Sequence, residues 1–505
     1  MMKINTAAQR WMQLDGTRNN IIRRAERFAK WTIQKVFPDS WYDGNNGVVS
    51  NEFQSLGAQA VNHLSNRLMM TLFAPSRPFF RLGPKKAAKE QLATIDPDQR
   101  KAMENKLSVV EREAADVIDR KSMRSKLYEL LKLLIITGNA LMILKGDMRI
   151  LNLRSYCVRR DINGKVIELM IREKVQREEI DPEALALAQQ SGQFQLTPDG
   201  CTYQYRWVKW DSKRSKYVED QWLNDFKLPP QYQSIYAESK MPYHAVTWDL
   251  SSGMHYGTGL VEDYKGDFAA LTALSRSTIN AAIMNSEFRW LIRAGAMTSP
   301  QDLANSRNGD VLMGEEGDIT PLNSGMEVKL NTNITVAQEY VQRIGAAFML
   351  QSAVTRQAER VTTVELRMNA EELEGGLGGA YSRLAGGLQI PLATFCLDES
   401  GYSVANSNFE ATVITGLAAL SRVGDRDRLM SFLQSITPLM QASPQEVIPR
   451  LRISALLSDI ASAEGIDRDA YVLTDAEFQQ MQAMQQQAQM QQMANQAAVQ
   501  QEFNQ

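Results

Sequence analysis

The feature that most constrains this 505-residue chain is a long helical pattern without a proline, over residues 260–293. Only Gly266 interrupts it, and many of its residues are alanine, serine or threonine. Small side chains let helices approach one another closely. Such a helix suits packing against copies of itself better than filling a thick core, so the sequence predicts self-association.

A second helix and an irregular insert follow it. Residues 294–333 are rich in Gly, Asn, Pro and Ser, with strand candidates at 311–313 and 328–330. Apolar residues return at helical spacing over 334–354. The order helix, insert, helix predicts a helical hairpin that carries a small tip domain.

The N-terminal part has mostly helical patterns. The first 37 residues combine apolar residues at helical spacing with eight basic against two acidic side chains, and Pro38 is expected to end that helix. We interpret its basic side as the solvated face of a packed helix, with a nucleic-acid or partner contact as the alternative. Further expected elements are helices over 51–73, 96–119 and 126–137, a strand at 79–82, and a left-handed C-cap at Gly138.

Residues 140–250 change to β patterns. Segments rich in β-branched and aromatic residues alternate with turn signals, at 140–144, 151–159, 166–174, 201–210 and 217–222. Asn163-Gly164 is a strong hairpin signal, and a helical insert is expected near 182–191. The aromatic residues of these strands are interpreted as core and cross-strand pairs, with a binding stripe as the alternative: Tyr205, Trp207, Trp210 and Trp222. The expected fold is mainly α with an antiparallel β region (α+β).

The C-terminal part has a polar loop, a glycine-rich helix and a low-complexity tail. A capping box at 362–365 is expected to start a helix that ends near residue 389, before Pro391. This helix contains six glycines between 375 and 387, and each costs about 0.5–1 kcal/mol relative to alanine. A bend or a close helix contact should therefore accompany them. Three short helices are expected beyond, at 412–420, 425–436 and 444–463, before a Gln/Met-rich tail.

Enzymatic, metal and membrane functions find little support in the sequence. The chain has three histidines, three widely spaced cysteines and a formal net charge of −2, and it shows no phosphate-binding P-loop or serine-nucleophile motif. The longest apolar run, 133–144, is shorter than the roughly twenty residues that span a bilayer. The N-terminus shows no secretory signal. We therefore expect a non-enzymatic protein with no cofactor, no metal site and no membrane partner.

Several short motifs share their order and spacing with one protein family. The matching stretches are Trp31-Thr32-Ile33 with Phe37-Pro38, Leu56-Gly57-Ala58 through Leu68 to Phe73, Gly138-Asn139-Ala140-Leu141, Arg160-Asp161 with Asn163 to Val166, Tyr256-Gly257-Thr258-Gly259, and Phe348 to Val354 through Glu359 to Thr362. With them the chain resembles the portal (head-to-tail connector) proteins of short-tailed, podovirus-type bacteriophages, from about residue 10 to 475. It departs from that pattern in the glycines of 375–387 and in the tail.

The resemblance implies a ring, usually of twelve copies, at one vertex of the capsid. Family members consist of a wing, a stem, a clip and a crown. The corresponding ranges here are 1–259 with 362–395 for the wing, 260–293 and 334–354 for the stem, 294–333 for the clip, 355–361 for the tunnel loop, 396–475 for the crown, and 476–505 for the tail.

The resemblance also implies a channel through which double-stranded DNA is packaged and ejected. Its implied partners are the terminase large subunit, then the tail adaptor and tail proteins, with scaffolding and major capsid proteins around the ring. The implied location is the portal vertex of the virion, after assembly in the host cytoplasm. The candidate channel residues are Arg356, Gln357 and Arg360 in the tunnel loop, and Lys265, Arg276, Arg289 and Arg293 in the stem.

Two other classes remain open at this point. One is a different oligomeric virion scaffold, such as a tail adaptor or minor capsid protein. The other is a nucleic-acid-processing enzyme with a basic N-terminal arm. A ring with a central hole in negative-stain images would favour the portal over the enzyme.

Overall fold

A computed structural model defines two compact units, the first formed by 1–83, 111–359 and 372–413, the second by 84–110, 360–371 and 414–505. The residues that it describes are 6–39, 53–74, 78–85, 97–192, 194, 196–198, 200–286, 290–311, 313–315, 317–321, 326–350, 375–402, 409–413, 433–438, 441, 445, 456, 480, 481 and 484. Residues 396–413, expected at the start of the crown, belong to the first unit.

The N-terminal helices form close to their predicted ranges, but the single helix expected over 96–119 is divided at Asp116 into two. They are α1 (Ala7–Trp31), α2 (Leu56–Leu72), α4 (Pro97–Ala115), α5 (Val117–Arg120) and α6 (Met123–Thr137). The expected continuation of α1 to Pro38 is wrong, because the helix ends at Trp31 and a 3-10 turn follows at Gln34–Val36. The reason is tertiary: the Gln54 side-chain amide, just before α2, donates to the Trp31 carbonyl at 2.7 Å.

The β region contains two antiparallel sheets. The smaller has the order β10–β2–β3 and consists of β2 (Asn139–Lys145), β3 (Asp147–Leu151) and β10 (Tyr243–Thr247). The larger consists of β4 (Tyr156–Arg160), β5 (Val166–Gln176), β6 (Cys201–Asp211), β7 (Lys216–Leu223) and β8 (Phe226–Lys227), with β9 (Ser234–Ala237) also paired to β7. The expected insert is the helix α7 (Pro182–Gln190).

One predicted strand is wrong in its extent. The segment 151–159 was expected as a single strand, yet residues 152–155 separate β3 from β4. Arg18 of α1, a buried side chain, donates to the main-chain carbonyls of Leu153 and Tyr156. Leu153 lies in the separating segment, and Arg18 gives its carbonyl a hydrogen-bond partner outside any strand ladder.

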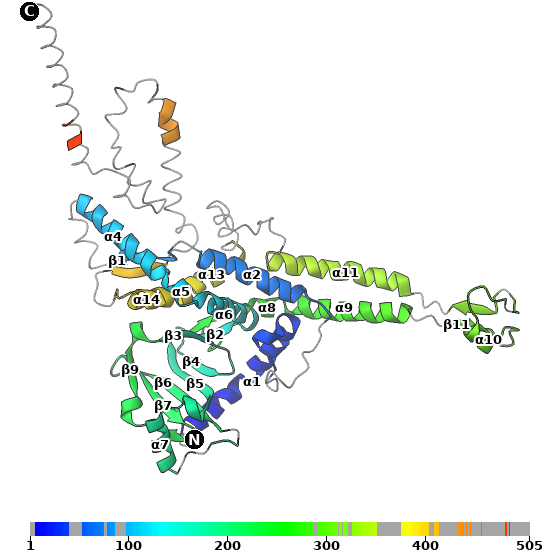
Figure 1. Ribbon diagram of the computed structural model, residues 1–505, viewed down its shortest axis with the longest axis horizontal. Coiled ribbons are helices and arrows are strands. Elements are labelled where there is room, and N and C mark those ends of the chain that lie inside the picture. The colour runs from blue at the N-terminus through cyan, green and yellow to red at the C-terminus, as the bar shows by residue number, and fades with distance from the viewer. Residues whose placement is uncertain are drawn as a thin grey trace, which may run out of the picture. The chain divides into compact units, whose positions relative to one another are not determined.

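Helix α1 packs on the larger sheet, and the aromatic residues form the core there (Figure 1). Trp11 of α1 lies among Met170, Tyr205 and Trp222. Tyr205 and Trp222 face each other across β6 and β7. The interpretation of these residues as core and cross-strand pairs is therefore confirmed for the two buried ones.

Four basic side chains of α1 form ion pairs with acidic side chains of the same chain. Ion pairs join Arg10 to Glu168, Arg18 to Asp15, Arg24 to Glu262 and Lys30 to Asp39. Burial raises the pKa of the Glu168 carboxyl, but hydrogen bonds from Arg10, Trp207 and Arg159 outweigh burial, and this pKa lies below its ordinary value. These pairs support the interpretation of α1 as a packed helix.

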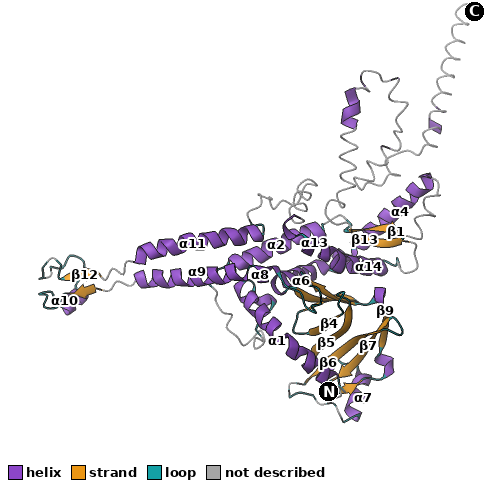
Figure 2. Ribbon diagram, turned by 180° about the vertical axis from the view of Figure 1, so that it is seen from behind, coloured by secondary structure: helices purple, strands orange, loops and turns teal. Residues whose placement is uncertain are grey.

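The predicted helical hairpin is present. Helices α8 (Leu260–Asp263) and α9 (Lys265–Ser286) form one arm and α11 (Met326–Ala347) forms the other, side by side with α9 (Figures 1 and 2). Two predictions are wrong at the far end. Residues 290–292, expected as helix, form the strand β11, and residues 328–330, expected as strand, lie in α11. Short apolar runs fit either structure, and pairing with β12 or with α9 decides between them.

The glycine-rich helix is irregular, and Gly378, with a φ of +46°, interrupts it. It contains α13 (Gly379–Leu384), a π-helical segment (Ala385–Gln389) and α14 (Ile390–Glu399). Its expected end before Pro391 is wrong, because Pro391 lies in the first turn of α14, where its missing N–H is tolerated. Residues 362–374 lie outside the described part of the chain.

The expected helix at 412–420 is wrong where it is described. Residues 412 and 413 belong to strand β13 (Phe409–Val413), which pairs with β1 (Phe80–Pro84). In the expected helix 425–436, the described residues 433–436 are helical. Most of 444–463 and of the tail lie outside the described residues.

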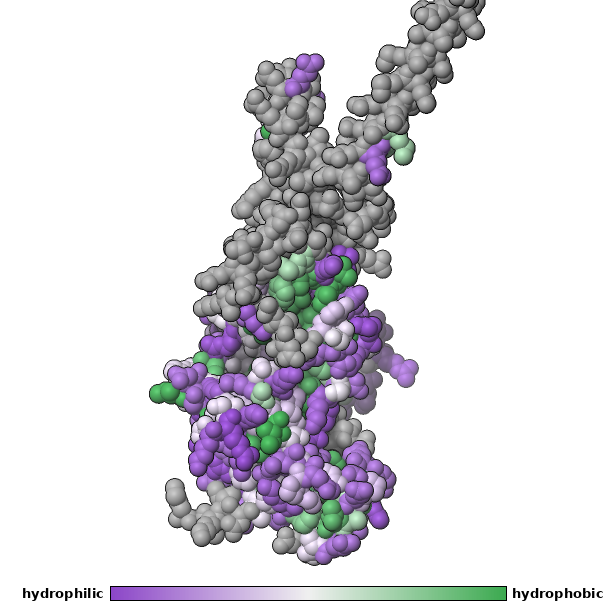
Figure 3. All heavy atoms as spheres, turned by 90° about the vertical axis from the view of Figure 1, so that its left-hand side faces the viewer, coloured by the Kyte–Doolittle hydropathy of each residue, from purple (hydrophilic) through white to green (hydrophobic). Residues whose placement is uncertain are grey.

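The surface seen in Figure 3 is mostly hydrophilic where its residues are described. Hydrophobic residues gather there only in small, separate patches. This view therefore shows no large apolar surface among the described residues.

Candidate functional site

The base of the hairpin is held by one buried asparagine. Asn139, 1% exposed, follows the C-cap of α6. Its side-chain nitrogen donates to the carbonyls of Thr137 at 2.8 Å and Gly257 at 2.7 Å, and its side-chain oxygen accepts from the Gly257 N–H at 2.8 Å. A single amide thus links the end of α6 to the loop that leads into α8.

Three glycines allow this contact. Gly138 has a φ of +74°, so the expected left-handed C-cap is confirmed. A Cβ on Gly259 would lie 2.7 Å from the Gly138 nitrogen and 2.7 Å from the Ile135 carbonyl oxygen, and a Cβ on Gly257 would collide with the main chain of Asp249. The motifs Gly138–Leu141 and Tyr256–Gly259, far apart in sequence, therefore form one joint.

Arg160 holds the same loop from the larger sheet. Its guanidinium donates to the carbonyls of Gly164 at 2.9 Å and Ala245 at 2.7 Å. The Val158 N–H donates to the Tyr256 hydroxyl at 3.1 Å, and burial raises the pKa of this tyrosine. The Asn-Gly turn and the loop before α8 are thereby tied together.

The two arms of the hairpin pack through a small aromatic and aliphatic core. Phe268 of α9 and Phe348, just after α11, are fully buried, and their ring centroids lie 5.7 Å apart. Arg343 and Asp267 add an ion pair at 3.6 Å between the arms. This core lies at the base of the hairpin, near the start of α9 and the end of α11.

Further along, both arms expose apolar side chains. These are Ile279 and Ile283 on α9 and Ile334 and Val341 on α11, with Ile283 as much as 54% exposed. The small residue Ala282 is also exposed and lies on the same side of α9 as Ile279 and Ile283, because the three positions are i, i+3 and i+4. An exposed strip of small and apolar residues is what the sequence predicts for a helix that packs against copies of itself.

The candidate channel residues are distributed unevenly. Lys265 and Arg276 are exposed on α9, and their spacing of eleven residues, about three turns, places them on the same side of the helix. Arg276 lies over the Phe53 ring, 5.7 Å from its centroid. Arg293 is not on the helix but in the tip, and Arg289, Arg356, Gln357 and Arg360 lie outside the described residues.

The tip is organised by Asp318, which the sequence reasoning missed. The tip comprises β11 (Trp290–Ile292), α10 (Pro300–Asn305) and β12 (Ile319–Pro321). The side chain of Asp318 is 1% exposed and accepts hydrogen bonds from the Glu315 N–H at 3.1 Å and the Thr298 hydroxyl at 3.3 Å, while Arg293 pairs with it at 3.0 Å. These contacts, the Glu315 N–H first, lower the pKa of Asp318.

The outer surface of the tip carries isolated apolar side chains. Met297, Val311 and Met313 are all strongly exposed, with Val311 at 97%. No local sequence signal distinguishes Asp318 from the other acidic residues of the insert. Only the pairing of β11 with β12 brings Arg293 beside it.

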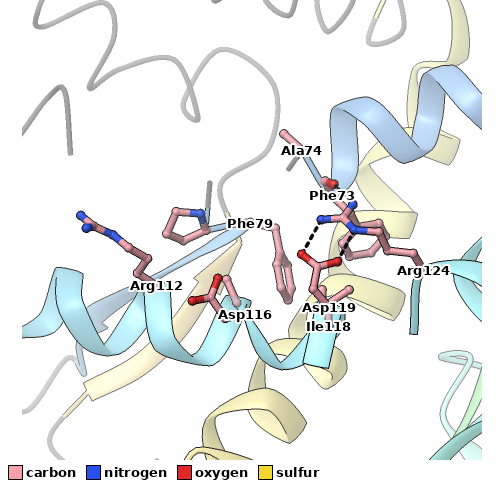
Figure 4. Close-up of a pocket in the computed structure, with 10 residues that line it drawn as sticks. Phe73, Ala74, Phe79, Arg112, Asp116, Ile118, Asp119 and Arg124 are labelled. Atoms are coloured by element: carbon pink, nitrogen blue, oxygen red, sulfur yellow. Dashed lines mark hydrogen bonds and ion pairs between the residues drawn. The ribbon is translucent and has the colours of Figure 1, made fainter. Parts of the chain in front are cut away.

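A cavity of about 260 Å³ lies between the end of α2 and the α4–α5 junction (Figure 4). Phe73, Phe79 and Ile118 supply its apolar wall. Asp119 and Arg124 pair with each other across its rim, and Arg124 also donates to the Phe73 carbonyl at 2.9 Å. Its polar groups thus stabilise the fold, and no acid–base or nucleophilic pair lines it.

The described residues contain neither a metal-binding cluster nor a membrane-spanning helix. Among them, no group of three or more His, Cys, Asp and Glu side chains is arranged to hold a metal ion. No helix in the described part of the chain has the length and hydropathy needed to cross a membrane.

Comparison with known proteins identifies the class. The bacteriophage head to tail connecting protein family matches residues 4–472. Relatives named portal protein occur in Pseudomonas phage phiKMV, 31% identical over 96% of this chain and 96% of the relative, and in Escherichia phage T7, 30% identical over 92% and 87%. A third, in Enterobacteria phage SP6, is 29% identical over 95% and 92%.

Solved structures from gene transfer agent particles are more distant. A chain in the neck of an empty particle matches 75% of this chain and 86% of its own length, with 14% identity and a TM-score of 0.35. A chain in the virion of a native particle matches 73% and 89%, with 15% identity and a TM-score of 0.32.

The chain therefore belongs to the bacteriophage head to tail connecting protein family. Its role is that of a portal connector in the virion, at the junction of head and tail, and the family is a structural one. The resemblance inferred from the motifs is thus confirmed.

The joint at the base of the hairpin yields a paired prediction. Gly259→Ala should lower the free energy of unfolding by about 1–3 kcal/mol, because its Cβ has no room beside Gly138 and Ile135. Gly266→Ala is the matched control on α9, where a Cβ meets nothing within 4 Å. It should be neutral or stabilise by about 0.5–1 kcal/mol. Urea unfolding measures both, and equal effects would contradict the close packing.

The tip yields a prediction about pH. Because the folded-state pKa of Asp318 lies below its ordinary value of 3.8, the charged carboxylate stabilises the tip fully above that value. This contribution should be lost as pH falls below 3.8 through the folded-state pKa. Hydrogen exchange at the Glu315 amide should accelerate in that window, beyond the intrinsic change of exchange with pH.

Two variants test the assignment to Asp318. Asp318→Asn should already show fast exchange at the Glu315 amide at pH 7, with no further loss of protection on acidification. Asp302→Asn, at an exposed position of α10, should behave as the wild type. Wild-type protection at Glu315 in Asp318→Asn would contradict this role.

Proposed function

We propose that this protein forms a closed ring of twelve copies at one capsid vertex, with the hairpins packed around a central channel. The observation that carries the proposal is the exposed strip of small and apolar residues on α9 and α11. Burial of apolar surface contributes about 25 cal/mol per Å², so strips repeated around a ring supply a large driving force. The joint at Asn139 supports the proposal because it holds the base of each hairpin to the wing.

Double-stranded DNA passes through this channel during packaging and ejection. Each phosphate that a protein binds adds salt-dependent affinity, so a channel that must let DNA slide should carry little net charge. The three hairpin helices contain five acidic and four basic residues. This near balance suits passage of DNA, with Lys265 and Arg276 as the described candidates for transient phosphate contacts.

The proposed tunnel loop, 355–361, adds a positive ring inside the channel. It contains Arg356 and Arg360 against Glu359, and Gln357 adds a polar group. Repeated around a ring, one net positive charge per subunit attracts the DNA backbone at one level without lining the whole channel.

The tip, as the clip, docks the terminase large subunit during packaging and the tail adaptor with its tail proteins afterwards. Its exposed Met297, Val311 and Met313 suit contacts that must form and later be replaced. Scaffolding and major capsid proteins contact the ring during assembly in the host cytoplasm. The protein itself catalyses no reaction and needs no cofactor, because the terminase supplies the energy for translocation.

A tip replacement tests ring formation and docking together. A Gly/Ser linker in place of 294–321 leaves both hairpin helices intact. Mass measurement in solution should give a ring with the same subunit number as the wild-type ring, because the exposed strip remains. The variant should lose binding to the terminase large subunit in pull-down experiments.

The mass measurement tests ring formation, and the pull-down experiment tests docking. A wild-type protein that stays monomeric at micromolar concentration would refute the ring. A ring of the tip variant that binds the terminase as well as the wild type would refute docking at the clip.

The tunnel-loop arginines give a prediction about packaged DNA. Arg356→Ala with Arg360→Ala should leave ring assembly unchanged, because a surface charge contributes only about 0–1 kcal/mol. Heads filled in vitro should retain DNA less well or stop packaging early. The measurement is DNA length per particle.

The control removes two basic residues elsewhere. Arg177→Ala with Lys213→Ala changes exposed positions at the ends of the wing strands. These heads should contain normal DNA. Full-length, normally retained DNA in the tunnel-loop variant would remove Arg356 and Arg360 from the channel role.

A further inference from the structure

The C-terminal end of α11 has an unusual backbone. After Ala347 the chain turns sharply, and Met349 has a φ of +57°, in the left-handed region that residues with a Cβ rarely occupy. The Leu350 N–H donates to the Gly345 carbonyl at 2.7 Å, and the Met349 N–H to the Ala346 carbonyl at 3.2 Å. A strained turn of this kind persists only where its surroundings hold it.

Packing holds this turn on two sides. Phe348 is fully buried against Phe268 and lies 6.2 Å from the Tyr264 ring. Met349 is also buried, and its terminal methyl group lies where a Cβ on Gly376 would be. The main-chain carbonyl of Met349 belongs to the same turn and has a neighbour on α2.

Arg67 of α2 approaches that carbonyl. Its side chain is 8% exposed, and its Nη1 lies 3.4 Å from the Met349 carbonyl oxygen. The Met349 carbonyl lies just beyond the last residue of α11, and the C-terminus of a helix carries partial negative charge. A buried guanidinium at this place therefore stabilises the turn mainly by charge and, at this length, by a weak hydrogen bond.

We propose that Arg67 is a positioning residue, which fixes the direction in which the chain leaves α11 and so the start of the segment that leads to the tunnel loop. The loop's contact with DNA belongs to the function proposed above, and the placement of the turn does not depend on it. Arg67 acts from the wing, so it couples the wing to the channel without touching DNA.

The direct test is hydrogen exchange in the assembled protein. Arg67→Met keeps most of the side-chain volume and removes the charge. Exchange at the Met349 and Leu350 amides should become at least tenfold faster, with ring assembly unchanged. Arg67→Lys, which restores the charge without the planar fork, should recover part of the protection.

The matched control is Arg343→Met, the same substitution on α11 itself. Arg343 is exposed and pairs with Asp267, away from the turn, so exchange at Leu350 should stay as in the wild type. Unchanged exchange at both amides in Arg67→Met would overturn the proposal. Equal acceleration in both variants would also overturn it.

DNA length per filled head separates this proposal from the function of the loop. If the Arg356/Arg360 variant loses DNA, Arg67→Met should shorten retained DNA as well, and normal DNA in Arg67→Met would overturn the positioning role. If the Arg356/Arg360 variant retains normal DNA, the loop's role fails. Hydrogen exchange then decides the role of Arg67 by itself.

Discussion

The contact on which the rest of the structure depends is the two-sided hydrogen bonding of Asn139 to the main chain of Gly257. A buried amide left without partners costs about 1–3 kcal/mol, so this side chain strongly favours one arrangement of the two segments that it joins. Glycines at 138, 257 and 259 let the segments come close enough for the amide to reach. The hairpin begins directly after this joint, and the joint therefore fixes where α8 and α9 start.

Arginine side chains likewise bind main-chain carbonyls near the ends of other strands and helices. Arg18 binds carbonyls between β3 and β4, Arg160 binds those of the Asn-Gly turn and β10, and Arg67 lies against the end of α11. A planar guanidinium has several donors and suits carbonyls that point in different directions. These three arginines thus bind main-chain carbonyls inside the first compact unit. The exposed apolar strip of the hairpin, with near-balanced charge around it, remains for assembly and for a channel.

Local signals in the sequence predicted a substantial part of this fold. The hairpin with its insert, the Asn163-Gly164 turn and the C-cap at Gly138 are all predicted correctly, because each depends on residues a few positions apart. The errors at 290–292 and at 328–330 share a cause. In each, a short apolar segment fits two structures, and a partner distant in sequence selects one of them.

The sequence by itself determined the α+β class, the order of the elements and the family, since the family motifs recur with their order and spacing. It did not show that Gly138–Leu141 and Tyr256–Gly259 form one joint, because a contact across 118 residues leaves no local pattern. The sequence also did not single out Asp318 from the other acidic residues of the insert. Its role follows from the pairing of β11 with β12, which brings Arg293 beside it. Tertiary structure decided the joint and the role of Asp318. Close approach of two backbones and burial of a charge depend on which distant segments meet, and local sequence propensity does not contain that information.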